Sequence, residues 1–142
     1  MLSSYAMRFR KYLIICGLGL AGCSTSGNYT AAKVATEGLQ RLMDNGEYTT
    51  IYDQLDKRFK AAATLDGFSG FLKRIARKTG KCGTSVTSLG GYKGWNSNGL
   101  VTTNSDRNCE NGKLEEQFYW SVVNGKASLA GYRLNNPKVL PN

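Results

Sequence analysis

The stretch that decides the predicted fold spans residues 113–134 and reads KLEEQFYWSVVNGKASLAGYRL. Apolar and polar residues alternate on both sides of the pair Asn124-Gly125, as they do in strands that bury one face. Asn and Gly tolerate the positive φ angles of a two-residue hairpin turn, so this pair predicts a tight turn between antiparallel strands. We therefore expect a β-hairpin with strands over residues 114–123 and 127–134.

The alternation also predicts which face of this hairpin is buried. The face that should meet the rest of the domain carries Leu114, Phe118, Trp120 and Val122. The wetter face carries Glu115, Gln117, Tyr119 and Ser121. If Val123 pairs with Lys126, the expected cross-strand pairs are Trp120 with Leu129, Phe118 with Gly131 and Glu116 with Arg133. The last pair would be an ion pair at the rim of the buried face.

Upstream of residue 80, helical periodicity replaces the alternation. Apolar residues recur at three-and-four spacing over residues 30–45, from about residue 50 to 63, and over 69–78. Gly46 and Gly80 are placed to end the first and third of these helices. Residues 82–89 and 100–109 have the composition of strands, and Asn111-Gly112 is a second hairpin signal. The pattern predicts an α+β domain, with three N-terminal helices packed on a four-stranded antiparallel meander sheet.

The start of the chain has the features of an export signal. Arg8, Arg10 and Lys11 precede an apolar run over residues 12–20, which is too short to span a membrane permanently. Met7, directly before this basic cluster, is an alternative start to Met1.

The four residues Leu20-Ala21-Gly22-Cys23 resemble the lipobox of bacterial lipoproteins. The resemblance implies cleavage before Cys23 and acylation of its thiol and amine, and two or more acyl chains anchor a protein stably. An ordinary secretory signal with a chance cysteine is the alternative. Ser24 favours the outer membrane, facing the periplasm, because an aspartate there would resemble an inner-membrane retention signal. We expect a signal over residues 1–22, acylated Cys23 with a tether over 23–29, and one domain over 30–142.

The net positive charge of the mature protein favours anionic partners. The formal charge is +9, and the signal removes three of the 19 basic residues and none of the 10 acidic ones, leaving about +6. A membrane-tethered, exported location argues against nucleic acid as a partner. The polyanions within reach are lipid headgroups, lipopolysaccharide phosphates and cell-wall polymers. The expected partners are the membrane, through the N-terminal lipid, and an anionic envelope component or a protein.

Two of the four cysteines remain for the folded domain. Cys16 leaves with the signal and Cys23 carries lipid, so Cys82 and Cys109 form one pair in an oxidising compartment. A structural disulfide is the expected outcome. A redox pair is the alternative, although the close Cys-x-x-Cys spacing of such pairs is absent. Zinc is not expected, because the chain has no histidine and only two thiols remain.

The residues offer little catalytic chemistry, and we expect no enzyme and no cofactor. Without histidine the commonest general base and metal ligand are missing. A pair of carboxylates, for instance Glu116 with Asp106, is the one catalytic arrangement still conceivable, since a glycosidase needs only two acids at a fixed separation.

Two features mark a candidate binding surface. The first is a basic cluster without an intervening acid: Lys73, Arg74, Arg77, Lys78 and Lys81. It could contact anionic headgroups or glycan, or it could be a solvated helix face with cations near the helix C-terminus. The second is the Gly- and Asn-rich stretch over residues 89–99, in which Tyr92 and Trp95 either form a recognition loop or cap the core.

Three segments resemble an uncharacterised bacterial domain found in small exported proteins: residues 74–86 (RIARKTGKCGTSV), 113–120 (KLEEQFYW) and 123–134 (VNGKASLAGYRL). The domain is grouped with the cystatin-like and nuclear-transport-factor-like folds. The resemblance implies that fold and an envelope location, and it supplies no catalytic residues. In such domains a tryptophan often precedes the final Gly-Tyr element, where this chain has Ser128 or Leu129.

The expected function is a non-catalytic binding or structural lipoprotein of the cell envelope. The alternative is an inhibitor or immunity lipoprotein that protects against a cell-wall-degrading enzyme, with the Tyr92 and Trp95 stretch inserted into its cleft.

Overall fold

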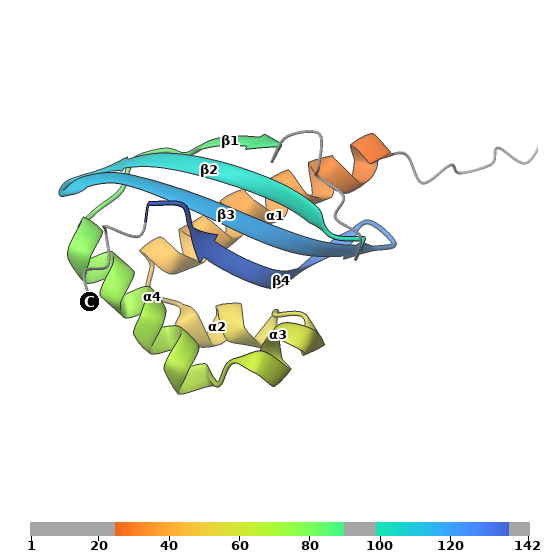
Figure 1. Cartoon of the computed structure of the whole chain (residues 1–142), viewed down its shortest axis with the longest axis horizontal. Coiled ribbons are helices and arrows are strands. Elements are labelled where there is room, and N and C mark those ends of the chain that lie inside the picture. Colours follow the sequence, from red (N-terminus) through yellow and green to blue (C-terminus); the bar gives the residue numbers. More distant parts are fainter. Residues whose placement is uncertain (1–24, 90–98, 137–142) are drawn as a thin grey trace, which may run out of the picture.

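A computed structural model describes residues 25–89 and 99–136 and confirms the predicted α+β architecture. Four helices precede four strands: α1 (Thr25–Asp44), α2 (Tyr48–Asp53), α3 (Lys57–Ala62), α4 (Leu65–Thr79), β1 (Val86–Leu89), β2 (Val101–Cys109), β3 (Gly112–Val123) and β4 (Lys126–Leu134). The strands form one antiparallel sheet in the order β1-β2-β3-β4. Figure 1 shows the helices below the sheet, with α1 running along it and α4 crossing beneath. Among the described residues, no helix is long and apolar enough to span a membrane.

Helix α1 is longer than predicted. It begins at Thr25, five residues before the expected start, so most of the predicted tether is helical. Its buried residues Ala32, Thr36, Gln40 and Met43 recur at four, four and three positions and form one stripe. After Asp44 the chain turns through Gly46, whose φ is 72°, where a residue without Cβ is favoured.

The second predicted helix is two short helices, so the expected count of three was wrong. α2 and α3 are separated because the backbone at Leu55 and Asp56 pairs with strand β4. The Asp56 N–H donates to the Leu129 carbonyl at 2.8 Å, and the Asp56 carboxylate accepts from the Arg58 N–H at 2.9 Å to cap α3. The apolar periodicity continues across residues 54–56 and gives no sign of the break. The break is explained by the backbone contact with β4.

Helix α4 presents one apolar stripe to the sheet. Phe68, Leu72, Ile75 and Thr79 are buried, and the Thr64 hydroxyl caps the first turn by accepting from Gly67 N–H at 3.1 Å. The helix ends at Gly80, as predicted, with a φ of 69°. A Cβ at Gly80 would collide with the Glu110 carboxylate, so the close approach of the β2–β3 turn also requires glycine here.

The β3–β4 hairpin has the predicted turn and a register shift beyond it. Asn124 and Gly125 have φ angles of 50° and 74°, and Val123 pairs with Lys126 and Trp120 with Leu129, as predicted. A bulge between Tyr119 and Trp120 then shifts the register by one residue. The predicted pairs were therefore wrong beyond this point: Phe118 faces Tyr132 and Glu116 faces Leu134. The expected ion pair of Glu116 with Arg133 does not form.

The start of β1 and the turn between β2 and β3 differ from the predicted positions. β1 starts at Val86, and Cys82 forms only an isolated bridge to Cys109. In the β2–β3 hairpin Cys109 pairs with Gly112, so the turn residues are Glu110 and Asn111, one position before the predicted pair.

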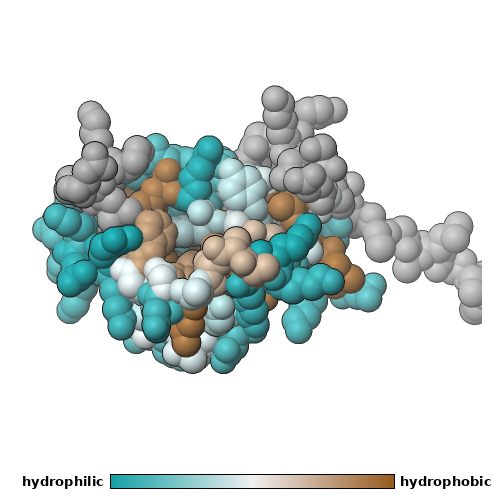
Figure 2. Space-filling model, turned by 60° about the horizontal axis from the view of Figure 1, so that its bottom comes forward, coloured by the Kyte–Doolittle hydropathy of each residue, from teal (hydrophilic) through white to brown (hydrophobic). Residues whose placement is uncertain are grey.

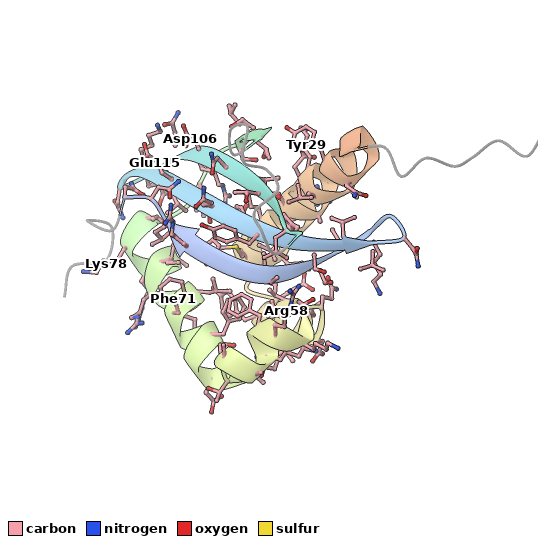
Figure 3. The ribbon with its side chains drawn as sticks, turned by 45° about the vertical axis from the view of Figure 1, so that its right-hand side comes forward. Tyr29, Arg58, Phe71, Lys78, Asp106 and Glu115 are labelled. Atoms are coloured by element: carbon pink, nitrogen blue, oxygen red, sulfur yellow. A yellow bond between two sulfur atoms is a disulfide. The ribbon has the colours of Figure 1, made fainter. Side chains whose placement is uncertain are left out.

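The core lies between the sheet and the helices. Leu114, Phe118 and Trp120 from β3 are buried there, which confirms the predicted inner face. Glu115, Gln117 and Tyr119 are only partly buried on the outer face. In Figure 3 Asp106 and Glu115 lie on the side of the sheet away from the helices, whereas Phe71 lies on the helical side.

Candidate functional site

A chain of buried polar side chains crosses from α1 to the sheet. The Trp120 indole N–H donates to Thr36 Oγ1 at 3.0 Å and to Thr103 Oγ1 at 3.1 Å, and the two hydroxyls are 2.8 Å apart. Thr36 Oγ1 also donates to the Ala32 carbonyl at 2.8 Å, so Thr103 supplies the proton between the two hydroxyls. These bonds fix α1 over strands β2 and β3.

One turn further along α1, Gln40 holds a buried carboxylate. Its amide donates to Glu116 Oε2 at 2.8 Å and to Ser105 Oγ at 2.7 Å. The Tyr132 hydroxyl donates to Glu116 Oε1 at 2.7 Å. Both carboxylate oxygens therefore have partners, and the Glu116 side chain is fully buried. Such complete pairing is what allows a buried carboxylate to persist in a core.

Burial controls the protonation of this pair. Desolvation raises the pKa of Glu116 above its ordinary value of 4.5, against the opposing effects of Tyr132, Gln40 and Arg107. Burial and the neighbouring carboxylate raise the pKa of Tyr132 well above its ordinary value of 10.0. Glu116 therefore keeps its proton to higher pH in the folded protein than in the unfolded chain.

This linkage predicts a pH-dependent effect of Glu116→Gln. The wild-type stability linked to Glu116 is fully present below pH 4.5 and is lost as pH rises through the raised folded pKa. Glutamine keeps an acceptor for Gln40 and offers an N–H to Tyr132, but it carries no charge. In urea unfolding, the stability of the variant relative to wild type should increase progressively as pH rises above 4.5. Glu115→Gln, on the outer face, is the matched control, and an equal pH slope in wild type and Glu116→Gln would contradict the assignment.

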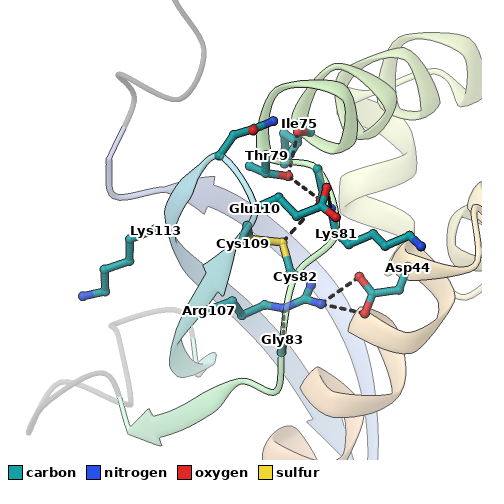
Figure 4. The surroundings of a disulfide bond; sticks show 12 residues. Asp44, Ile75, Thr79, Lys81, Cys82, Gly83, Arg107, Cys109, Glu110 and Lys113 are labelled. Atoms are coloured by element: carbon teal, nitrogen blue, oxygen red, sulfur yellow. Dashed lines mark hydrogen bonds and ion pairs between the residues drawn. A yellow bond between two sulfur atoms is a disulfide. The ribbon is translucent and has the colours of Figure 1, made fainter.

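The end of the domain beyond α1 and α4 holds a buried arginine and a disulfide (Figure 4). Arg107 is 3% exposed, and its Nη2 lies 2.7 Å and 2.6 Å from the two carboxylate oxygens of Asp44. The disulfide joins Cys82 to Cys109, as predicted. Beside it, the Lys81 N–H donates to Glu110 Oε2 at 3.1 Å.

A cavity of about 660 Å³ opens at this end. Its volume lies in the range of small-molecule sites, which are typically apolar with a few oriented polar groups. Met43, Leu72 and Ile75 form apolar walls. The charged residues of the lining are Asp44, Arg107, Lys81 and Glu110, and Asn45, Tyr48 and Thr79 add further polar groups. Because apolar walls meet oriented ion-pairing groups here, this cavity is the candidate binding site.

Two smaller cavities are more uniformly apolar. One of about 430 Å³ lies between α1, α2 and the β3–β4 hairpin, and one of about 200 Å³ lies between α3, α4 and β4. The smaller is lined by Phe59, Phe68, Phe71 and Tyr132 among others. Figure 2 shows the helical side of the molecule, where apolar side chains gather centrally among hydrophilic ones.

The structure separates the predicted site residues. The basic residues on α4 and in the turn after it are all exposed: Lys73, Arg74, Arg77, Lys78 and Lys81. Asp106 pairs with Glu115 on β3 and so shares its face of the sheet, whereas Glu116, the next residue along β3, points to the opposite face. The proposed glycosidase pair is therefore excluded. Cys23, Tyr92 and Trp95 lie outside the described residues.

Sequence reasoning missed the buried polar groups. A signal was present in β2, where Val101, Thr103, Ser105 and Arg107 alternate toward the core. Polar residues occupy both faces of this strand, so alternation of hydrophobicity could not identify the inner one. On α1, Thr36 and Gln40 occupy stripe positions between apolar residues. Their roles depend on partners more than sixty residues away.

Comparison with protein-family models, with curated proteins and with solved structures finds no match for this chain.

Proposed function

We propose that this protein is a lipoprotein of the bacterial outer membrane, facing the periplasm, whose α+β domain is a non-catalytic binding or structural module. The observation that carries the proposal is the sequence of basic residues, apolar run and Leu20-Ala21-Gly22-Cys23.

The Cys82–Cys109 disulfide supports export to an oxidising compartment. Disulfides persist in the periplasm and outside the cell, whereas cytosolic thiols are kept reduced. The two cysteines bridge a separation of 27 residues and fasten the end of α4 to the end of β2. A structural role of this kind suits a small exported domain.

Binding rather than catalysis is supported by the state of the acidic groups. Glu116 is fully buried, and its two carboxylate oxygens accept hydrogen bonds from Gln40 and Tyr132. The carboxylate therefore links α1 and β4 to β3 within the core. Asp44 is committed to Arg107 through both of its oxygens. The cavity beside this ion pair offers shape and apolar contact, which are the elements of a binding site.

Replacing Cys23 by alanine tests the anchor. The variant should accumulate as an unprocessed precursor and lose metabolic labelling with radioactive palmitate, because the acylated thiol is absent. Cys16→Ala, within the apolar run, is the matched control and should be labelled like wild type. Undiminished labelling of the Cys23 variant would contradict the proposed lipoprotein.

A further inference from the structure

Helix α4 carries its positive charges on the side opposite its buried stripe. Leu72, Ile75 and Thr79 face the core. At 100° per residue, Lys73, Arg74, Arg77 and Lys78 lie within an arc of about 140° centred away from that stripe. All four are exposed, and exposed Lys81 follows Gly80 directly. We call these five residues the cationic end.

None of the described side-chain ion pairs involves the cationic end, and the acid next to it, Glu110, bonds to the Lys81 backbone N–H. By contrast, Arg58, Arg107 and Lys113 each take part in an ion pair. Lys73 lies over the ring of Tyr48, with Nζ 5.9 Å from its centroid. In the sequence no acidic residue occurs between Asp66 and Asp106. Five cations gathered around one nearby carboxylate leave a net positive potential suited to a polyanion.

The cationic end lies far from the start of α1. The last residues of α1 and the last turn of α4 line the same cavity, so the two helices end together. α1 has 20 residues, which gives it a length of about 30 Å. Figure 3 shows Tyr29, near the start of α1, and Lys78, near the end of α4, on opposite sides of the molecule.

The length of α1 separates the cationic end from the membrane-anchored N-terminal end that the proposed function requires. Thr25, the first residue of α1, follows Cys23 after a single intervening residue, so a lipid anchor would hold that end of the helix close to the bilayer. If α1 stands upright on the bilayer, its length places the cationic end about 30 Å from the surface, well beyond the screening length of about 8 Å at physiological salt. In that orientation the cationic end faces an anionic partner on the side away from the anchoring membrane.

We propose that the cationic end docks onto the carboxylate-bearing glycopeptide of the cell wall, and this inference rests on the proposed anchor at Cys23. The wall is an extended polyanion located away from the membrane surface, and its repeated carboxylates match several cations on one helix face. The exposed guanidinium groups of Arg74 and Arg77 can pair with carboxylates in a bidentate manner. The domain would then link the membrane to the wall.

Co-sedimentation of the purified, acylated protein in detergent with insoluble peptidoglycan tests the docking. The variant Arg77→Ala/Lys78→Ala should bind at least about ten-fold more weakly than wild type, since each cation near an anionic surface contributes to attraction. The control Lys57→Ala/Lys126→Ala removes the same charge from exposed positions on α3 and the β3–β4 hairpin, and should bind within about two-fold of wild type. Amidating the wall carboxylates, or adding about 0.5 M salt, should abolish the difference between the variants.

Three results would overturn the inference: equal binding by both double variants, binding that survives amidation, or binding to anionic phosphatidylglycerol vesicles through Arg77 and Lys78 without binding to the wall. The intact mass of the purified protein shows whether Cys23 is acylated, and so distinguishes failure of the docking from failure of the proposed anchor. A protein without acyl chains that still binds the wall contradicts the proposed function alone. An acylated protein that does not bind peptidoglycan contradicts only the proposed docking.

Discussion

Replacing Trp120 by alanine is expected to lower the free energy of unfolding by about 3–5 kcal/mol, the usual cost of truncating a buried tryptophan. The side chain is 3% exposed and packs on Phe118 with ring centroids 6.2 Å apart. Its indole N–H also joins Thr36 on α1 to Thr103 on β2. The truncation therefore removes packing from the centre of the core and the donor that the two hydroxyls share. Because small domains are stable by about 5–15 kcal/mol in total, urea unfolding should show a large fall in the midpoint.

Trp120→Phe separates the two contributions. Phenylalanine retains most of the apolar surface but lacks the donor, and Thr36 and Thr103 still bond to one another at 2.8 Å. We expect a cost of about 1–2 kcal/mol for this variant. Equal losses for the alanine and phenylalanine variants would mean that the hydrogen bonds, and not the packing, dominate the contribution of Trp120.

Removing the disulfide is expected to have the second largest effect. For two cysteines separated by 27 residues, the chain-entropy model gives about 3–4 kcal/mol of stabilisation, because the cross-link restricts the unfolded chain. The double variant Cys82→Ala/Cys109→Ala should lose this amount in urea unfolding. The folded structure should survive, since backbone hydrogen bonds run beside the cross-link: Gly83 N–H to the Asn108 carbonyl at 2.8 Å and Glu110 N–H to the Lys81 carbonyl at 2.9 Å.

Treatment with a thiol reductant provides the control for this prediction. Reduced wild-type protein should match the double alanine variant, and the variant itself should not respond to the reductant. A loss below about 1 kcal/mol in both would show that the unfolded chain gains little freedom when the bond is absent.

The regular part of the fold was predictable from local pattern. Asn124-Gly125 specified a turn through its tolerance of positive φ, and the alternation around Phe118 and Trp120 specified the buried face. The bulge beside Tyr119 was not predictable, because an extra residue in one strand leaves the composition unchanged while it shifts every later pair. The break between α2 and α3 likewise depends on β4, which follows it by about seventy residues.

The candidate site was less predictable than the fold. The pairing of Cys82 with Cys109 followed from counting cysteines, and the exposure of the basic residues on α4 followed from helical spacing. The environment of Glu116 did not follow, because a charged residue between Leu114 and Phe118 reads as a rim position. Its burial depends on Gln40 and Tyr132, which reach it from other elements. Long-range hydrogen bonds of this kind leave no periodic trace in the sequence.

The contact of Asp56 with Leu129 has a consequence for how these molecules could associate. The Asp56 N–H donates a hydrogen bond to the Leu129 carbonyl on the outer side of β4. Part of that edge of the sheet is therefore already bonded within the molecule. The other end of the strand order is β1, which has four residues. Strand-by-strand stacking into a fibre needs two open edges on every molecule. Because the Asp56 contact blocks part of β4, continuous strand-by-strand addition along this edge is disfavoured.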